Sequence, residues 1–369
     1  MRILFPLEVP TCHPGNPYVL QLMDALIHER GVSYVGSGCA SLYWPKPRWD
    51  VIHIQWPEAL VGWEEPNSCK LETLRSALKR AKRHASIVVT IHNYHPKEWP
   101  LGRELYQSVY KYADAFVHLG ERSLDWFLEK NKDKRWCAAA IHEVIEHGEY
   151  SFYEGLPQEN NALVRHLALS DKVYLVFGSI WKKEELTLAE NAFQIARLPS
   201  AKLMIAGVVR PNAKNQERRP ALEDPDIIRF HKSVPDRQVK PLVRASDFVF
   251  VPRIGRLNSG VVALAFTYDT PVIGPNQGVI GEMIKATDNI SYSPGNAKSA
   301  AEALRMAYSL SDEQYRAMSH RVREYRQKHM LWPDLAKRHI VLYKRTRHFS
   351  RILKSRFRTM KNLLSNALH

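Results

Sequence analysis

The sequence has few cysteines and no long apolar run. Cys12, Cys39, Cys69 and Cys137 form no CxxC pair, so neither a disulfide framework nor a zinc knuckle is expected. No window holds the ~20 uncharged apolar residues that a membrane-spanning helix requires. The opening Met-Arg-Ile-Leu-Phe-Pro is too short for a signal peptide. These absences favour a soluble globular protein of the cytoplasm.

Acidic residues are missing from the end of the chain. None follows Asp334, whereas ten lysines and arginines lie between Lys337 and Lys361, and the net charge is +15. Apolar residues at near-helical spacing predict a cationic amphipathic helix over Lys344 to Leu368. Such a helix suits an anionic membrane surface, where each Lys or Arg contributes about 1 kcal/mol. This predicts peripheral binding to the inner face of the plasma membrane; packing on the domain or on a partner is the alternative.

The pattern of apolar runs predicts an α/β fold. With 369 residues and 45% hydrophobic content, the chain is long enough for two cores. Strand-like runs alternate with helical stretches, which predicts parallel sheets in two Rossmann-like halves. A polar linker around 155–161 gives domains at 1–160 and 161–325, followed by a crossing helix and basic tail at 326–369. The expected strands are 2–5, 51–54, 87–91, 173–177, 202–206, 227–230 and 247–251, and the expected helices include 18–30, 123–129, 186–196 and 239–244.

The segment from Arg253 to Pro275 has the features of a phosphate site. A buried strand precedes it, and Asn258 or Ser259 can cap the helix that follows. The free N–H groups at that helix start would face an anion, and Gly260 would let a ligand approach the backbone. Arg253 and Arg256 add positive charge and are expected at a solvent-lined cleft. An ordinary βαβ turn with incidental arginines is the alternative.

Several segments in order carry a resemblance to GT-B glycosyltransferases over roughly residues 1 to 330. The second half resembles their nucleotide-sugar half. The first half resembles bacterial group 1 sugar transferases that build surface polysaccharides. The segments of the second half are Phe177–Lys183, Lys202–Gly207, Ser233–Asp236, Ala245–Asp247 and Asn258–Gly260; those of the first half are His53–Glu58, Thr90–Pro96 and His147–Tyr150.

The resemblance implies two Rossmann-like domains facing a cleft, with C-terminal helices crossing back to the first domain. It implies transfer of a sugar from a nucleotide-diphosphate donor to a glycan or lipid-linked acceptor, with no cofactor besides that substrate. Retaining members often carry two glutamates eight positions apart, but the matching positions here are Arg256 and Leu264, so the stereochemical outcome stays open. The implied donor-binding residues are Gly178, Ser179, Lys182, Lys183, Ser233, Val234, Arg253, Arg256, Asn258, Ser259 and Gly260.

The chemistry of sugar transfer points to further residues. Fixed N–H dipoles and arginines would stabilise the departing diphosphate. If the sugar inverts, a carboxylate or histidine must take the acceptor proton. His92, Glu98, Glu149 and Glu58 are the candidates, all expected on loops at the carboxyl ends of strands. His92 ranks first because it directly follows the strand 87–91.

The acceptor is expected to meet aromatic and amide side chains of the first half. Trp56 and Tyr94 are placed to stack on sugar rings, although aromatics at such places also serve as packing. Asn93 is a further acceptor-binding candidate. Asn16 and Tyr18 either contact the acceptor or only begin the first helix.

A metal site and two rival functions fit the sequence less well than sugar transfer. A metal site is not expected, because His92 and His95 lie beside Pro96 in a loop and no carboxylate cluster accompanies them. A nicotinamide-dependent oxidoreductase would need GxGxxG after the first strand, where the chain has none. A non-catalytic protein that binds nucleic acid or another anionic polymer would explain the basic charge. However, that charge gathers in the tail and no nucleic-acid motif accompanies it.

Overall fold

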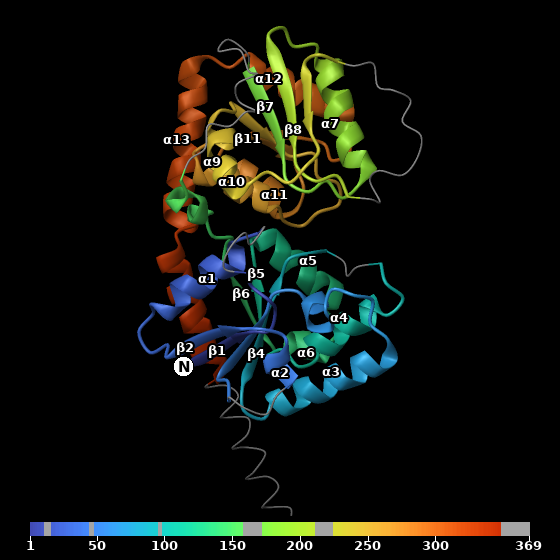
Figure 1. The fold of residues 1–369 in the computed structure, drawn as a ribbon, viewed down its shortest axis with the longest axis vertical. Helices are drawn as coiled ribbons and strands as arrows, with labels where there is room; N and C mark the ends of the chain where they lie inside the picture. Colours follow the sequence, from blue (N-terminus) through green and yellow to red (C-terminus); the bar gives the residue numbers. More distant parts are fainter. Residues whose placement is uncertain (11–15, 44–47, 95–97, 158–171, 211–223, 348–369) are drawn as a thin grey trace, which may run out of the picture. The chain divides into compact units, whose positions relative to one another are not determined.

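The computed structural model describes residues 1–10, 16–43, 48–94, 98–157, 172–210 and 224–347. They form two units. The first takes Met1–Glu146 together with the chain from Trp332 onward, and the second is His147–Leu331. Each unit holds one six-stranded sheet with helices around it (Figure 1). The predicted α/β class with two Rossmann-like halves is confirmed, whereas the domain boundaries at 160 and 325 stay predictions.

The sheet of the first unit is parallel throughout, in the order β2-β1-β3-β4-β5-β6. Its inner strands β3 and β4 are mostly apolar and completely buried, as is usual for a parallel sheet covered on both faces. The strands are β1 (Arg2–Phe5), β2 (Tyr34–Ser37), β3 (Val51–Ile54), β4 (Ser86–Ile91), β5 (Ala115–His118) and β6 (Ile141–Val144). The helices are α1 (Tyr18–Ile27), α2 (Ala40–Tyr43), η1 (Pro57–Val61), α3 (Ser68–Ala81), α4 (Gly102–Tyr110), α5 (Glu121–Asn131) and α6 (Arg135–Ala138).

The sheet of the second unit is also parallel, in the order β12-β11-β10-β7-β8-β9. Helices α7 and α12 pack on each other, and so do α10 and α13. The strands are β7 (Lys172–Phe177), β8 (Ala201–Ala206), β9 (Ile227–Phe230), β10 (Phe248–Phe250), β11 (Val272–Pro275) and β12 (Ile290–Tyr292). The helices are η2 (Ser151–Gly155), α7 (Lys183–Ala196), α9 (Asp236–Arg244), α10 (Gly260–Thr267), α11 (Gly278–Ala286), α12 (Ala297–Tyr308) and α13 (Asp312–His329).

After α13 the chain returns to the first unit, as the sequence predicted. Residues 332–347 are helical. Tyr343 on this helix is completely buried, and Arg347 forms an ion pair of 2.6 Å with Asp50 at the start of β3. The predicted amphipathic helix from Lys344 to Leu368 lies mostly outside the described residues, because these end at position 347.

Both sheets contain a point where the strand order reverses. In the first sheet β2 and β3 lie on opposite sides of β1, and in the second β8 and β10 lie on opposite sides of β7. Loops that leave the carboxyl ends of strands at such a point diverge and leave a crevice, which is where open α/β sheets bind ligands. The loops after β1 and β3, and those after β7 and β10, are therefore the places to search for a site.

A close backbone contact joins the ends of β7 and β8. Gly178 and Gly207 follow these two strands and both have positive φ, +89° and +152°. A Cβ on Gly207 would lie 2.0 Å from the carbonyl oxygen of Gly178. Only glycine at position 207 lets the two loops leave the sheet side by side.

We expect Gly207→Ala to lose about 3 kcal/mol of folding free energy, because the added methyl group overlaps main-chain atoms that cannot rotate away. Gly155→Ala is the matched control in the same unit, since nothing lies within 4 Å of its added methyl group. Urea unfolding of both variants measures the difference. Equal urea midpoints for the two variants would show that the loops can move apart to accept the methyl group with no loss of folding free energy.

Candidate functional site

Arg253, in the β10–α10 loop, forms hydrogen bonds that hold the loop from β7 to α7 in place. The Arg253 side chain donates hydrogen bonds to the carbonyl oxygen of Ser179, at 2.9 Å, and to Oε2 of Glu185, at 3.0 Å. Glu185 Oε2 also accepts from the Trp181 main-chain N–H. The Arg253 side chain is 12% exposed and that of Glu185 0%. Arg253 was expected at a solvent-lined cleft; instead it is half of a buried ion pair that fixes the loop.

Arg256 lies on the more open side of the same carboxylate. Its side chain is 32% exposed, and its Nε lies 4.0 Å from Glu185 Oε1. That oxygen has no hydrogen-bond partner among the described residues. Burial lowers the pKa of Arg256, Glu185 raises it, and the neighbouring charge of Arg253 lowers it further. The guanidinium group of Arg256 can therefore still donate hydrogen bonds to a ligand, whereas that of Arg253 donates to groups of the protein itself.

A third arginine joins the cluster from the loop after β8. The Arg210 guanidinium lies 4.8 Å from the ring centre of Trp181, and that of Arg256 lies 6.0 Å from the same ring. Arg210 also donates to the Ser179 hydroxyl at 3.5 Å. Trp181 is 47% exposed, so its ring lies at the surface and holds both guanidinium groups near the loop.

Positive charge exceeds negative charge at this end of the second sheet. The guanidinium groups of Arg253 and Arg256 share one buried carboxylate, that of Glu185, and Arg210 lies against Trp181. Lys182 and Lys183 at the start of α7 are exposed. Guanidinium groups bind phosphate oxygens through paired hydrogen bonds. The arginine cluster, meaning Arg210, Arg253 and Arg256, is thus a candidate site for a phosphorylated ligand.

The start of α10 differs from the sequence interpretation in two respects. Ser259 occupies the cap position, but neither its side chain nor another makes a capping hydrogen bond there. A Cβ at position 260 would lie 2.4 Å from the Tyr150 hydroxyl oxygen. Gly260 therefore makes room for Tyr150 of the same unit. Its role as a ligand contact, like those of Asn258, Ser233 and Val234, stays a prediction.

In the first unit, three predicted residues lie together beyond β3 and β4. His92 stacks on Trp56, with ring centres 4.5 Å apart, and meets Tyr18 edge-on at 5.6 Å. Its Nε2 lies 2.8 Å from Oε1 of Gln55. Tyr18 is 2% exposed, so its ring supports His92 from inside the unit. A narrow cleft, with no room for a water molecule in this structure, passes His92 and Trp56 and is lined also by Gln55, Thr90, Asn93 and Tyr106.

Glu58 lies beneath this cleft. It is buried, and its Oε1 accepts a 2.8 Å hydrogen bond from the Tyr106 hydroxyl. Burial and the Glu58 charge raise the pKa of Tyr106, while a hydrogen bond with Asn93 lowers it. Asn93 and Glu58 are therefore both hydrogen-bonded to Tyr106.

The remaining predicted residues are placed apart from His92 or already have structural partners. Glu98 is exposed. Glu149 forms an ion pair of 2.9 Å with Arg326 inside the second unit. Tyr94 meets Trp126 edge-on at 5.0 Å. The Asn16 side chain accepts from the Tyr18 main-chain N–H at 3.1 Å, which begins α1.

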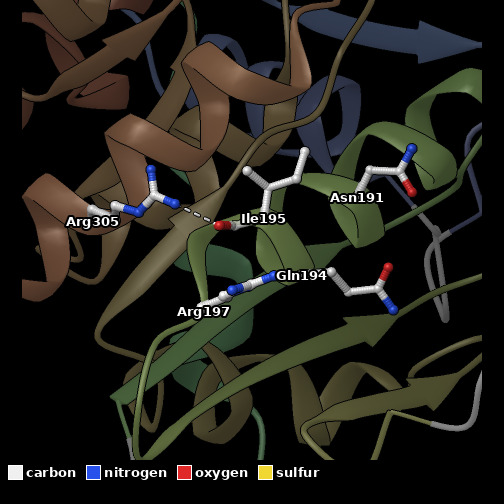
Figure 2. A pocket seen from close by; sticks show the side chains of 5 residues that line it. All are labelled: Asn191, Gln194, Ile195, Arg197 and Arg305. Atoms are coloured by element: carbon white, nitrogen blue, oxygen red, sulfur yellow. Dashed lines mark hydrogen bonds between the residues drawn. The ribbon is translucent and has the colours of Figure 1, made fainter.

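A wide surface pocket of about 420 Å³ lies elsewhere in the second unit. Figure 2 shows Arg305 of α12 reaching the carbonyl oxygen of Ile195 near the end of α7. Asn191, Gln194 and Arg197 complete the lining. Because α7 rises about 1.5 Å per residue, this pocket is about 18 Å from the helix start that faces the arginine cluster. The pocket belongs to the amino ends of the strands, away from the predicted ligand edge.

Comparison with known proteins settles the class of protein. Residues 171–309 match the family model of glycosyl transferases group 1. The chain is thus a glycosyltransferase in which residues 171–309 are similar to the group 1 family. The match spans the arginine cluster and both loops at the strand-order reversal of the second sheet, so these features lie in the part of the chain that the family defines.

Relatives and solved structures agree with this family. The glycosyltransferase is 23% identical over 287 residues to the GDP-mannose:glycolipid 4-beta-D-mannosyltransferase of Xanthomonas campestris pv. campestris, covering 74% of each chain. Its fold is similar to the sucrose-phosphate synthase of Thermosynechococcus elongatus, with a TM-score of 0.66, 14% identity and coverage of 93% and 98% of the two chains. It is also similar to Anabaena HepE in complex with UDP and glucose, with a TM-score of 0.62, 15% identity and coverage of 92% and 98%. These structures have the GT-B fold, which the sequence analysis predicted.

Two residues of the candidate site were not predicted from the sequence. Glu185 stands in a run of charged residues that resembles a solvated helix start, and only its burial reveals the pair with Arg253. Arg210 follows β8, which lies beside β7. An arginine just after a strand that neighbours the reversal point is the signal that would have identified it.

Within the described residues of the glycosyltransferase, no group of three histidine, cysteine or acidic side chains is arranged to hold a metal ion. The same residues include no helix with the length and apolar character needed to cross a bilayer.

We expect Arg253→Ala to destabilise the second unit by about 3–5 kcal/mol, because it leaves the buried Glu185 carboxylate without its partner. Adding Glu185→Gln should recover at least half of that loss, since the unpaired charge is gone. Urea unfolding of both single variants and the double variant measures the coupling. Arg323→Ala, which breaks an exposed pair with Asp269, is the control and should cost less than about 1 kcal/mol. Additive losses for Arg253→Ala and Glu185→Gln would contradict the pairing.

Proposed function

We propose that this glycosyltransferase moves a sugar from a nucleoside diphosphate donor to a lipid-linked glycan acceptor in surface polysaccharide synthesis. The arginine cluster at the strand-order reversal of the second sheet carries this proposal. GDP-mannose is the first donor to test, because the mannosyltransferase relative is named for it. UDP-glucose is the second, because the HepE structure holds UDP and glucose.

The two clusters have complementary roles in this proposal. Arg256 and Arg210 bind the diphosphate and stabilise the negative charge that grows on it as the glycosidic bond breaks. Arg253, tied to Glu185, keeps the loop in place for them. His92 in the first unit takes the proton of the acceptor hydroxyl, and Trp56 and Asn93 line its cleft. The arginines supply the positive charge at the leaving group, so we propose that the enzyme works without a metal or organic cofactor.

Binding of nucleic acid or another anionic polymer is the competing function. The arginine cluster is compact and centred on one short loop, which suits a diphosphate better than a polymer backbone. We therefore propose that the chain does not act on nucleic acid, and the binding experiment below includes DNA as a competitor.

We expect Arg256→Ala and Arg210→Ala each to weaken GDP-mannose binding roughly 10- to 100-fold, the loss typical of one charge-assisted hydrogen bond. Both side chains are partly exposed, so the variants should stay folded. Isothermal titration with GDP-mannose, UDP-glucose and GDP measures the affinities. Arg305→Ala, on α12 beside the far end of α7, is the matched control and should bind as the unaltered protein does.

Two results would reject this donor site. One is unchanged affinity in both the Arg256 and the Arg210 variant. The other is release of the bound nucleotide by excess duplex DNA, which would favour the polymer-binding function.

The C-terminal tail supports a second part of the proposal, binding to an anionic membrane that carries the acceptor. Ending the chain after Arg347 keeps the buried Thr346 and the ion pair between Arg347 and Asp50. We expect this truncated protein to bind GDP-mannose normally but to stop sedimenting with vesicles that contain anionic lipid. Binding of the full chain should fall with added salt, because exposed charges are screened over about 8 Å at physiological ionic strength. Equal sedimentation of both proteins would refute the anchoring role.

A further inference from the structure

A row of buried polar side chains runs through the first unit to His92. Tyr343, on the helix at 332–347, places its hydroxyl 2.7 Å from Nδ1 of His53 on β3. Nε2 of His53 lies 2.8 Å from the Thr90 hydroxyl and 3.2 Å from the Gln55 side-chain nitrogen. Gln55 Oε1 then meets Nε2 of His92 at 2.8 Å. Tyr343, His53, Gln55 and Thr90 are each at most 2% exposed.

Burying a row of polar side chains in a parallel sheet costs folding free energy. β3 and β4 are otherwise apolar and buried on both faces, where a polar group is tolerated only when its hydrogen bonds are complete. An aliphatic residue at position 53 would serve packing equally well. The row ends at His92, the half-buried histidine that lines the cleft. Its position therefore indicates that the row acts on His92.

The orientation of the Gln55 amide in the structure sets the direction of the hydrogen bonds in the row. The Gln55 amide nitrogen donates to Nε2 of His53, whose single lone pair is shared between this N–H and the Thr90 hydroxyl. A neutral His53 then carries its proton on Nδ1 and donates to Tyr343. Gln55 Oε1 can only accept, so Nε2 of His92 must carry a proton and donate to it. The lone pair of neutral His92 is therefore on Nδ1.

His53 stays neutral in this setting. Burial lowers its pKa well below the usual value, and the nearby rings of His339 and His92 lower it further. His339 donates from Nδ1 to the Leu335 carbonyl oxygen, and burial lowers its pKa to about 4. The proton of His339 is thus used in a hydrogen bond to the helix backbone and does not enter the row.

We propose that Tyr343, His53 and Gln55 are positioning residues that hold His92 with its proton on Nε2, so that Nδ1 receives the proton of the acceptor hydroxyl. This inference rests on the function proposed above. The acceptor oxygen forms a bond to the anomeric carbon, the bond from that carbon to the phosphate oxygen breaks, and the nucleoside diphosphate leaves with the electron pair. The proton moves from the acceptor hydroxyl to Nδ1 and later passes to water. The charged ring keeps its hydrogen bond from Nε2 to Gln55 throughout.

The tautomer of His92 can be measured directly. Nitrogen NMR of the full chain labelled on histidine, with His92→Gln to assign the signal, distinguishes a protonated Nε2 from a protonated Nδ1. The unaltered protein should show the proton on Nε2. Tyr343→Phe removes the acceptor for His53 and should shift the His92 tautomer ratio at least about tenfold toward Nδ1–H, although Tyr343 does not contact His92 in the row.

Kinetics of mannosyl or glucosyl transfer provide the second readout. Gln55→Met and Tyr343→Phe should lower kcat roughly 10- to 100-fold, as loss of a group that orients a functional histidine does, and leave KM for the donor unchanged. His92→Gln should lower kcat about 10²- to 10⁴-fold. Tyr174→Phe is the matched control, because it removes another buried hydroxyl, one that donates only to the Leu304 carbonyl oxygen, and should keep both values.

The outcomes separate this inference from the proposed function. A proton on Nδ1 of His92 in the unaltered protein, or full kcat in both Gln55→Met and Tyr343→Phe with GDP binding intact, would overturn the positioning role. Full kcat in His92→Gln would overturn the use of Nδ1 as the base. An unaltered protein that transfers no sugar from GDP-mannose or UDP-glucose, yet shows His92 protonated on Nε2, would reject the proposed function while the row of hydrogen bonds stands.

Discussion

Parallel strand pairing is the constraint on which the rest of this structure depends. Each strand must return through a crossover, so the carboxyl ends of all six strands in a sheet face one edge. Strands buried on both faces leave no room for charge except beyond those ends. Ser179, Arg210 and Arg253 therefore meet although they are distant in sequence, because β7, β8 and β10 lie side by side. The arginine cluster is a consequence of strand order.

Buried polar groups lie next to both proposed sites, and two of them, one in each unit, show how the fold accommodates them. Glu185 is a fully buried carboxylate on the first turn of α7, and His53 is a fully buried imidazole on β3. Each would destabilise the fold if left alone, and each is matched by partners from a neighbouring loop or strand. Both lie at the carboxyl edge of their sheet, where the matched groups orient side chains that a ligand can reach.

Strong apolar runs made most of the fold predictable from the sequence. β1, β3 and β9 match their predicted bounds. The edge strands β2, β6 and β12 were missed. Tyr34–Ser37 and Ile141–Val144 are half exposed and lack a continuous apolar pattern, and Ile290–Tyr292 is only three residues long. Site residues were harder, since a sequence shows which side chains carry charge but not which are buried. Arg253 and Arg256 stand three positions apart and look equivalent, yet a single carboxylate from another element gives them different surroundings.

That difference bears on how a site rich in arginine can work. A guanidinium group free in solvent must lose rotamer freedom when it binds phosphate, and this weakens binding. Folding has already ordered the loop through Arg253 and Glu185, and Trp181 limits the positions open to Arg210 and Arg256. The cations are thus arranged before the ligand arrives, which is the condition under which fixed charges stabilise a leaving group without reorganisation. The buried glutamate reduces the total charge of the site but makes the remaining charge effective.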